Sequence, residues 1–147
     1  LVGMKKINAA YAIGKRIMRL GTTSSVTLAL LTAIFGKHIL GMLTSDPWII
    51  STGTAILWVE IFLENGRALN FFGVNALRSA GDIYYPVIVG IIVMWAIQVV
   101  GSYFFGITMG WGLIAMWAVF AFDENTRGLI FLRRWNSMKW SGKSFVQ

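Results

Sequence analysis

Long apolar segments, separated by short polar breaks, are the main pattern along the chain. Residues 83–107 are 25 consecutive positions without Asp, Glu, Lys, Arg or His. At a rise of about 1.5 Å per residue, that run can cross a hydrocarbon core about 30 Å thick. The pattern predicts an all-α integral membrane fold with four transmembrane helices, followed by a cytosolic tail at residues 133–147. The helices are expected at about residues 10–43, 47–80, 83–105 and 111–132.

A soluble four-helix bundle is the alternative to this fold. It is disfavoured because the third segment has no polar face to present to water. Local signals also fit the predicted helix ends. Asp46 before Pro47 is typical of an N-cap followed by a proline in the first turn. Gly81 can adopt the left-handed conformation that ends many helices, and Asp82 is then a candidate cap for the third helix.

Composition and charge support a membrane protein and give its orientation. Of the 147 residues, 56% are hydrophobic and 13% are charged, and the net charge is +7. The basic residues gather at the ends of the apolar segments, so the positive-inside rule places both termini in the cytosol and the helices in the cell membrane. The chain starts with Leu1 and is expected to be a piece of a longer protein. The flanking basic residues are Lys5, Lys6, Lys15, Arg16 and Arg19 before the first helix, and Arg133, Arg134, Lys139 and Lys143 after the last.

The second segment carries charged side chains where a membrane helix would normally have none. Counted along a helix, Glu64 lies about 24 Å from Trp48 and about 21 Å from Arg78, within the hydrocarbon in either register. An ionised side chain there costs at least about 2.5–3.5 kcal/mol, so these groups must face a partner or a water-filled cavity. At 100° per residue, one side of the helix holds Glu60, Glu64, Arg67, Phe71, Asn75 and Arg78.

Two interpretations of this charged stripe remain open. In the first, Glu64 and Arg67 form a structural pair that holds the helix to its neighbours. In the second, Glu64, alone or with Glu60, exchanges a proton or a sodium ion, because one arginine offsets only part of two carboxylates. Asn70 and Asn75 either line the same cavity or bond a neighbouring helix.

A second charged group, Asp123 to Arg127, lies in the inner part of the fourth segment. Asp123 and Arg127 are spaced for an (i, i+4) ion pair, with Glu124 beside them. The favoured interpretation is a set of structural ion pairs or part of an inner gate, together with Arg78 and Asp82. The chain has no recognisable catalytic or metal-binding motif, so neither an enzyme nor a resident cofactor is expected.

Four motifs resemble the C-terminal portion of a MATE (multidrug and toxic compound extrusion) transporter. They are ENGRALN (64–70), NALRSAGDIYYP (75–86), GWGLIAMWAVFAFDENTRG (110–128) and RRWNSMKW (133–140). The resemblance covers nearly the whole chain and implies helices nine to twelve of a twelve-helix protein, within its second six-helix lobe. It also implies export of organic cations or other toxic compounds, by antiport with protons or sodium ions. The implied partners are the lipid bilayer, the N-terminal lobe and small-molecule organic cations, with no nucleic acid.

Two departures limit what the resemblance transfers. Asn65 stands where this subgroup usually has proline, so we expect a less kinked second helix. Arg67 aligns with an acid that helps to bind the coupling cation in some relatives, so that site is not transferred. Two other functions stay open. One is a lipid-linked oligosaccharide flippase of the same superfamily, and the other is a non-transporting membrane anchor subunit.

Overall fold

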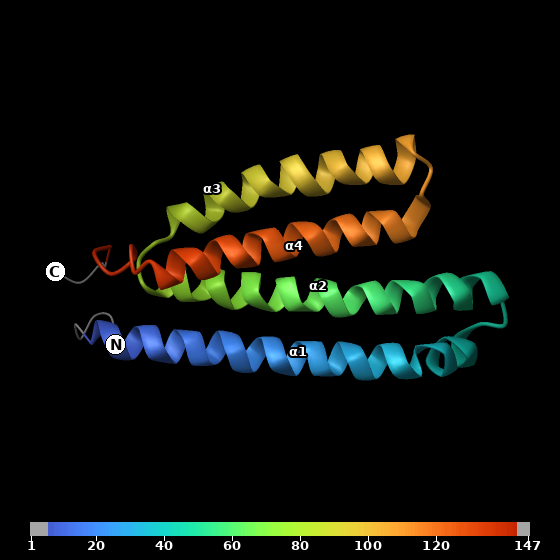
Figure 1. The fold of residues 1–147 in the computed structure, drawn as a ribbon, viewed down its shortest axis with the longest axis horizontal. Coiled ribbons are helices and arrows are strands. Elements are labelled where there is room, and N and C mark those ends of the chain that lie inside the picture. Colours follow the sequence, from blue (N-terminus) through green and yellow to red (C-terminus); the bar gives the residue numbers. More distant parts are fainter. Residues whose placement is uncertain (1–5, 144–147) are drawn as a thin grey trace.

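The computed structural model describes residues 6–143, which form four long helices joined by short connections (Figure 1). They are α1 (Ile7–Leu43), α2 (Pro47–Ser79), α3 (Tyr84–Val93) and α4 (Gly112–Asn136). Helix α3 continues as two π-helical segments, η1 (Met94–Val99) and η2 (Ser102–Thr108). The described residues contain no strand, which confirms the all-α prediction.

The helices lie side by side in the order α1, α2, α4, α3, and the start of α1 and the end of α4 lie at the same end of the bundle (Figure 1). The closest packing joins α2 to α4, and α1 packs against α2. Helix α3, η1 and η2 form one continuous rod, which is third in chain order and is called the third rod below. The third rod packs mainly against α4. An even number of helices that alternate in direction brings the two termini together, as four membrane crossings require.

The two outer helices of the row are the ones that suit lipid. Ile7–Leu43 and Tyr84–Thr108 are each long and apolar enough to span a membrane, with mean hydropathies of 1.7 and 2.1 over their best windows. The charged helices α2 and α4 lie between them (Figure 1). The arrangement is that of an all-α membrane protein in which the charged helices pack against each other.

The helix ends agree with most of the predicted signals. The Asp46 carboxylate accepts the Trp48 amide at 2.8 Å and so caps α2, and Gly81 has a φ of 96° after the end of that helix. The prediction that Asp82 caps α3 is wrong: Ile83 occupies the N-cap without a side-chain bond. The Asp82 carboxylate binds two cations instead. Helix α4 runs four residues past the predicted end at 132, to Asn136. Its last turn contains Arg133 and Arg134, whose positive charges interact favourably with the negative end of the helix dipole.

Candidate functional site

Two glycines bring the backbones of α2 and α4 close together. A Cβ atom added at Gly66 would lie 2.3 Å from the Asn125 backbone nitrogen. One added at Gly128 would lie 2.9 Å from the Gly66 carbonyl oxygen. Only glycine permits this approach, which places the charged side chains of both helices next to each other.

Two asparagines form hydrogen bonds between α2 and α4 at this close approach. The Asn125 side chain is buried and donates to the carbonyl oxygens of Phe62 at 2.8 Å and Ala121 at 2.7 Å. Its own oxygen accepts from Asn65 Nδ2 at 2.8 Å. Helix α2 runs without a break through Asn65, as the absence of a proline predicts. The position that is usually proline in the subgroup therefore supplies a bond between the helices.

The first carboxylate cluster consists of Glu60, Glu64 and Arg67 on α2, with Trp117 on α4. The Arg67 guanidinium pairs with Glu64 and also with Glu60, at 3.2 Å. The second oxygen of Glu60 accepts the Trp117 indole N–H at 2.6 Å. Both oxygens of Glu60 are thus bonded, whereas Glu64 receives a bond on one oxygen only among the described residues. The sequence alone did not indicate this bond, because Trp117 lies on a different helix from Glu60.

The second carboxylate cluster consists of Asp123, Glu124 and Arg127 on α4, with Asn70 on α2. Arg127 pairs with Asp123, as the spacing predicts, and with Glu124 at 2.7 Å. The other oxygen of Glu124 accepts from Asn70 Nδ2 at 2.7 Å. Asn70 thus bonds a neighbouring helix, one of the two roles considered for it. The Asp123 side chain is fully buried.

The two clusters have the same composition. Each joins two carboxylates to one guanidinium, and each has one acid with both oxygens bonded and one acid with a single bonded oxygen. With every group ionised, each cluster would carry a net charge of −1. An unbalanced charge at membrane depth is costly, so these clusters are suited to take up a proton or a cation.

Hollow spaces border the clusters along α2. Glu60 and Glu64 line a cavity of about 250 Å³ between α1 and α2. The next cavity, of about 430 Å³, is lined by Arg67, Asn70, Phe71, Val74, Asn75, Arg78 and Glu124. Of these, Asn75 donates to the carbonyl oxygen of Phe71 in its own helix, at 2.8 Å. Arg78 makes no ion pair within residues 6–143.

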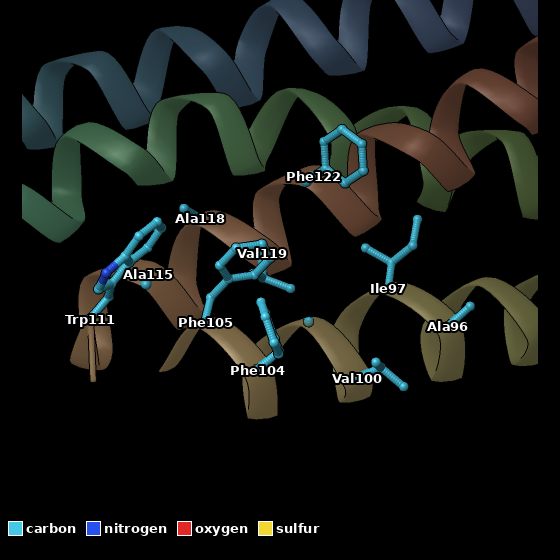
Figure 2. Close-up of a pocket in the computed structure, with 11 residues that line it drawn as sticks. Ala96, Ile97, Val100, Phe104, Phe105, Trp111, Ala115, Ala118, Val119 and Phe122 are labelled. Carbon is cyan, nitrogen blue, oxygen red and sulfur yellow. The ribbon is translucent and has the colours of Figure 1, made fainter. Parts of the chain in front are cut away.

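A larger cavity of about 550 Å³ lies between the π-helical part of the third rod and α4 (Figure 2). Its lining is apolar and includes Phe104, Phe105, Trp111 and Phe122. Because no charged side chain borders it, this cavity has no means of exchanging an ion. The candidate site is therefore the pair of carboxylate clusters.

Asp82 lies apart from both clusters, in the turn between α2 and α3. Its buried carboxylate accepts from Arg134 Nε at 2.8 Å and from Lys143 Nζ at 2.7 Å. The Arg134 guanidinium also lies 4.3 Å from the centre of the Tyr85 ring. Burial by itself raises the pKa of Asp82, but the hydrogen bonds and charges of Lys143 and Arg134 outweigh it and hold that pKa below its usual range. These contacts tie the turn to the end of α4.

Asp82→Asn should destabilise the full-length protein at neutral pH by about 1.5–3 kcal/mol, the usual contribution of a hydrogen bond to a charged group. Because the folded pKa of Asp82 is lowered, its stabilisation is present above the unfolded value of about 3.9 and is lost as pH falls through the folded value. The difference in thermal midpoint between the variant and the wild type should therefore shrink below about pH 4. Asp46→Asn is the control, since asparagine also caps a helix. A difference that stays constant down to acidic pH would contradict the assignment.

The fold and the clusters together define an all-α membrane protein with two carboxylate clusters where α2 packs against α4. Residues 1–104 match the model of the MatE family, and the chain belongs to that family. It is 37% identical over 145 residues to the uncharacterized transporter YisQ of Bacillus subtilis (strain 168). That alignment covers 99% of this chain and 32% of the relative, so the chain spans about a third of the length of that protein. No solved structure matches the chain.

Proposed function

We propose that the chain is part of the second lobe of a secondary active exporter in the cell membrane, with both described ends on the cytosolic side. The exporter antiports organic cations or other toxic compounds against protons or sodium ions. Membership of the MatE family supports transport. The proposed coupling step rests on one observation: Glu64 borders a cavity and accepts a hydrogen bond on only one of its oxygens.

The two acids of the first cluster have different roles in this proposal. Arg67 and Trp117 hold Glu60 from both sides, so each of its two oxygens already has a donor. Glu64 is held by Arg67 alone. With a proton on Glu64, the remaining charges of Glu60 and Arg67 cancel. Without that proton the cluster has a charge of −1, which attracts a cation from the cavity.

Antiport follows from this competition. The coupling ion and an organic cation both neutralise the same negative charge, so binding of one disfavours binding of the other. Exchange between the two sides of the membrane then requires only that the cavity open to one side at a time. The chain does nothing covalent in this cycle, which is why we expect no enzymatic activity.

The two alternative functions receive less support. A flippase for lipid-linked oligosaccharides needs free basic groups for phosphates, but Arg67 and Arg127 are each paired with two carboxylates. Only Arg78 borders a cavity without an ion pair among the described residues. A non-transporting anchor subunit would not need two carboxylate clusters between its helices.

Glu64→Gln in the full-length protein should reduce drug efflux at least about tenfold, equivalent to 1.36 kcal/mol, because the variant cannot alternate between neutral and charged forms. The residual efflux should no longer depend on pH or on sodium. Efflux is measured in proteoliposomes with an imposed proton or sodium gradient. Asp46→Asn, the same kind of change in an exposed connection, is the control. Unchanged efflux with an unchanged ion dependence would make Glu64 and Arg67 a structural pair.

A further inference from the structure

Buried polar atoms without partners gather where the third rod meets α4. Within residues 6–143, four buried side-chain atoms have no hydrogen-bond partner. Three of them belong to this pair of elements: Ser102 Oγ on η2, and Asp123 Oδ1 and Arg127 Nε on α4. A buried acceptor left unbonded costs about 1–3 kcal/mol, and more when it is charged. Asp123 is the acid in this group, and its side chain is fully buried.

Asp123 lies on the stripe of α4 that faces the third rod. Val119, four residues earlier, would contact a Cβ atom added at Gly101 on the rod, at 2.9 Å. Arg127, four residues later, lines a cavity of about 300 Å³ together with Gly90 and Met94 of the rod. Residues four apart share a helix face, so Asp123 points to the same neighbour.

The charges around Asp123 are unevenly distributed. On its own helix it has Arg127, which also serves Glu124. On α2, Arg67 is paired with Glu60 and Glu64, while Arg78 borders the same cavity as Arg127. The third rod, Tyr84–Thr108, has no Asp, Glu, Lys, Arg or His. The third rod therefore offers no cation to Asp123.

We propose that Asp123 is a second proton-binding site, separate from Glu64, with the proton on Oδ1. Glu124 has donors on both oxygens and needs none, whereas Asp123 has a donor on Oδ2 alone. A proton on Asp123 leaves one ionised acid opposite one guanidinium, so the second cluster becomes neutral. A metal cation would need several oxygen ligands at this point, and only one unbonded oxygen of the cluster is available.

The local backbone also suits a site that changes its state. Antiparallel packing pairs Gly101 with Val119 and brings Met94 near Arg127, so η1 (Met94–Val99) lies level with Asp123. π-Helical turns inside longer helices are rare and occur frequently at functional sites. The wider turn next to Asp123 gives the rod room to shift when the proton leaves. The inference goes beyond the proposed coupling through Glu64 and does not depend on it.

Infrared spectroscopy of the full-length protein tests this site directly. At neutral pH we expect a C=O stretching band from protonated carboxylic acids, and Asp123→Asn should remove the part of this band that belongs to Asp123. Glu124→Gln is the matched control and should leave the band in place, since both oxygens of Glu124 already accept hydrogen bonds. If Asp123→Asn does not fold, Asp123→Glu should shift the band, because it keeps the acid in a longer side chain. A band that Asp123→Asn leaves unchanged, or that Asp123→Glu does not move, would overturn the proposal.

Glu64→Gln separates this inference from the proposed function. The variant should retain the part of the band that belongs to Asp123, whatever happens to its efflux. Normal, ion-dependent efflux by Glu64→Gln would reject the coupling role proposed for Glu64 and leave the Asp123 band as a separate result. Loss of the whole band in Glu64→Gln, with none lost in Asp123→Asn, would assign the proton to Glu64 alone and reject the second site.

Discussion

Replacing Gly66 by valine should prevent the full-length protein from reaching its native fold. The first added carbon would lie 2.3 Å from the Asn125 nitrogen and 2.6 Å from the Glu124 carbonyl carbon, both backbone atoms that cannot rotate away. Overpacking usually costs about 1–3 kcal/mol, and a clash with a helix backbone falls at or above the upper end of that range. Separation of α2 from α4 would also break the bonds that Asn125 makes to α2. Yield of monodisperse protein and the thermal midpoint measure the effect.

Gly90→Val provides the matched control for that variant. Gly90 also lies inside a helix, but a Cβ atom there meets nothing within 4 Å among the described residues. We expect a yield and a thermal midpoint close to those of the wild type. Equal behaviour of the two valine variants would show that the helices do not cross at Gly66.

The fold could be predicted largely from local signals. A membrane helix must satisfy its own backbone hydrogen bonds, so a long apolar run such as residues 83–107 has few structures available to it. Asp46 and Gly81 act on their immediate neighbours, and both behave as predicted. Asp82 does not, because its partners Arg134 and Lys143 are distant in sequence and bind it more strongly than a helix amide would.

The candidate site could be predicted only within each helix. The pairs Glu64–Arg67 and Asp123–Arg127 follow from spacing along one helix and are present. The bonds from Trp117 to Glu60 and from Asn70 to Glu124 depend on how α4 is rotated against α2. That rotation is set by close contacts such as the one at Gly66. A glycine in the sequence indicates that two helices can approach closely, but it does not indicate which face of the other helix it meets.

These cross-helix bonds decide which acid of each cluster has an unbonded oxygen among the described residues. The sequence shows two acids and one arginine in each group and leaves the surplus acid unassigned. Trp117 binds the second oxygen of Glu60, which leaves Glu64 as the acid of the first cluster with one unbonded oxygen among the described residues. Asn70 satisfies Glu124 in the same way, which leaves Asp123 in the second. In each cluster, one donor from the opposite helix therefore distinguishes the acid with two bonded oxygens from the acid with one.

Arg127→Met should destabilise the full-length protein by about 3–5 kcal/mol, the usual cost of removing one partner of a buried ion pair. The Arg127 side chain is 14% exposed and the Glu124 side chain is 20% exposed, so little water is available to replace the lost guanidinium. Methionine keeps most of the length and apolar volume of the side chain, which makes the charge the main difference. The thermal midpoint in detergent measures the loss. A midpoint equal to that of the wild type would show that the second cluster is not ionised at all.

A second substitution identifies the acid that Arg127 neutralises. If Asp123 holds a proton, the ionised acid of the second cluster is Glu124. Adding Glu124→Gln to Arg127→Met should then restore much of the lost stability, because the amide oxygen can still accept from Asn70. Adding Asp123→Asn should restore little, because it replaces a neutral group by another neutral group. The reverse order of rescue would place the negative charge on Asp123, since only removal of the ionised partner relieves an uncompensated buried charge.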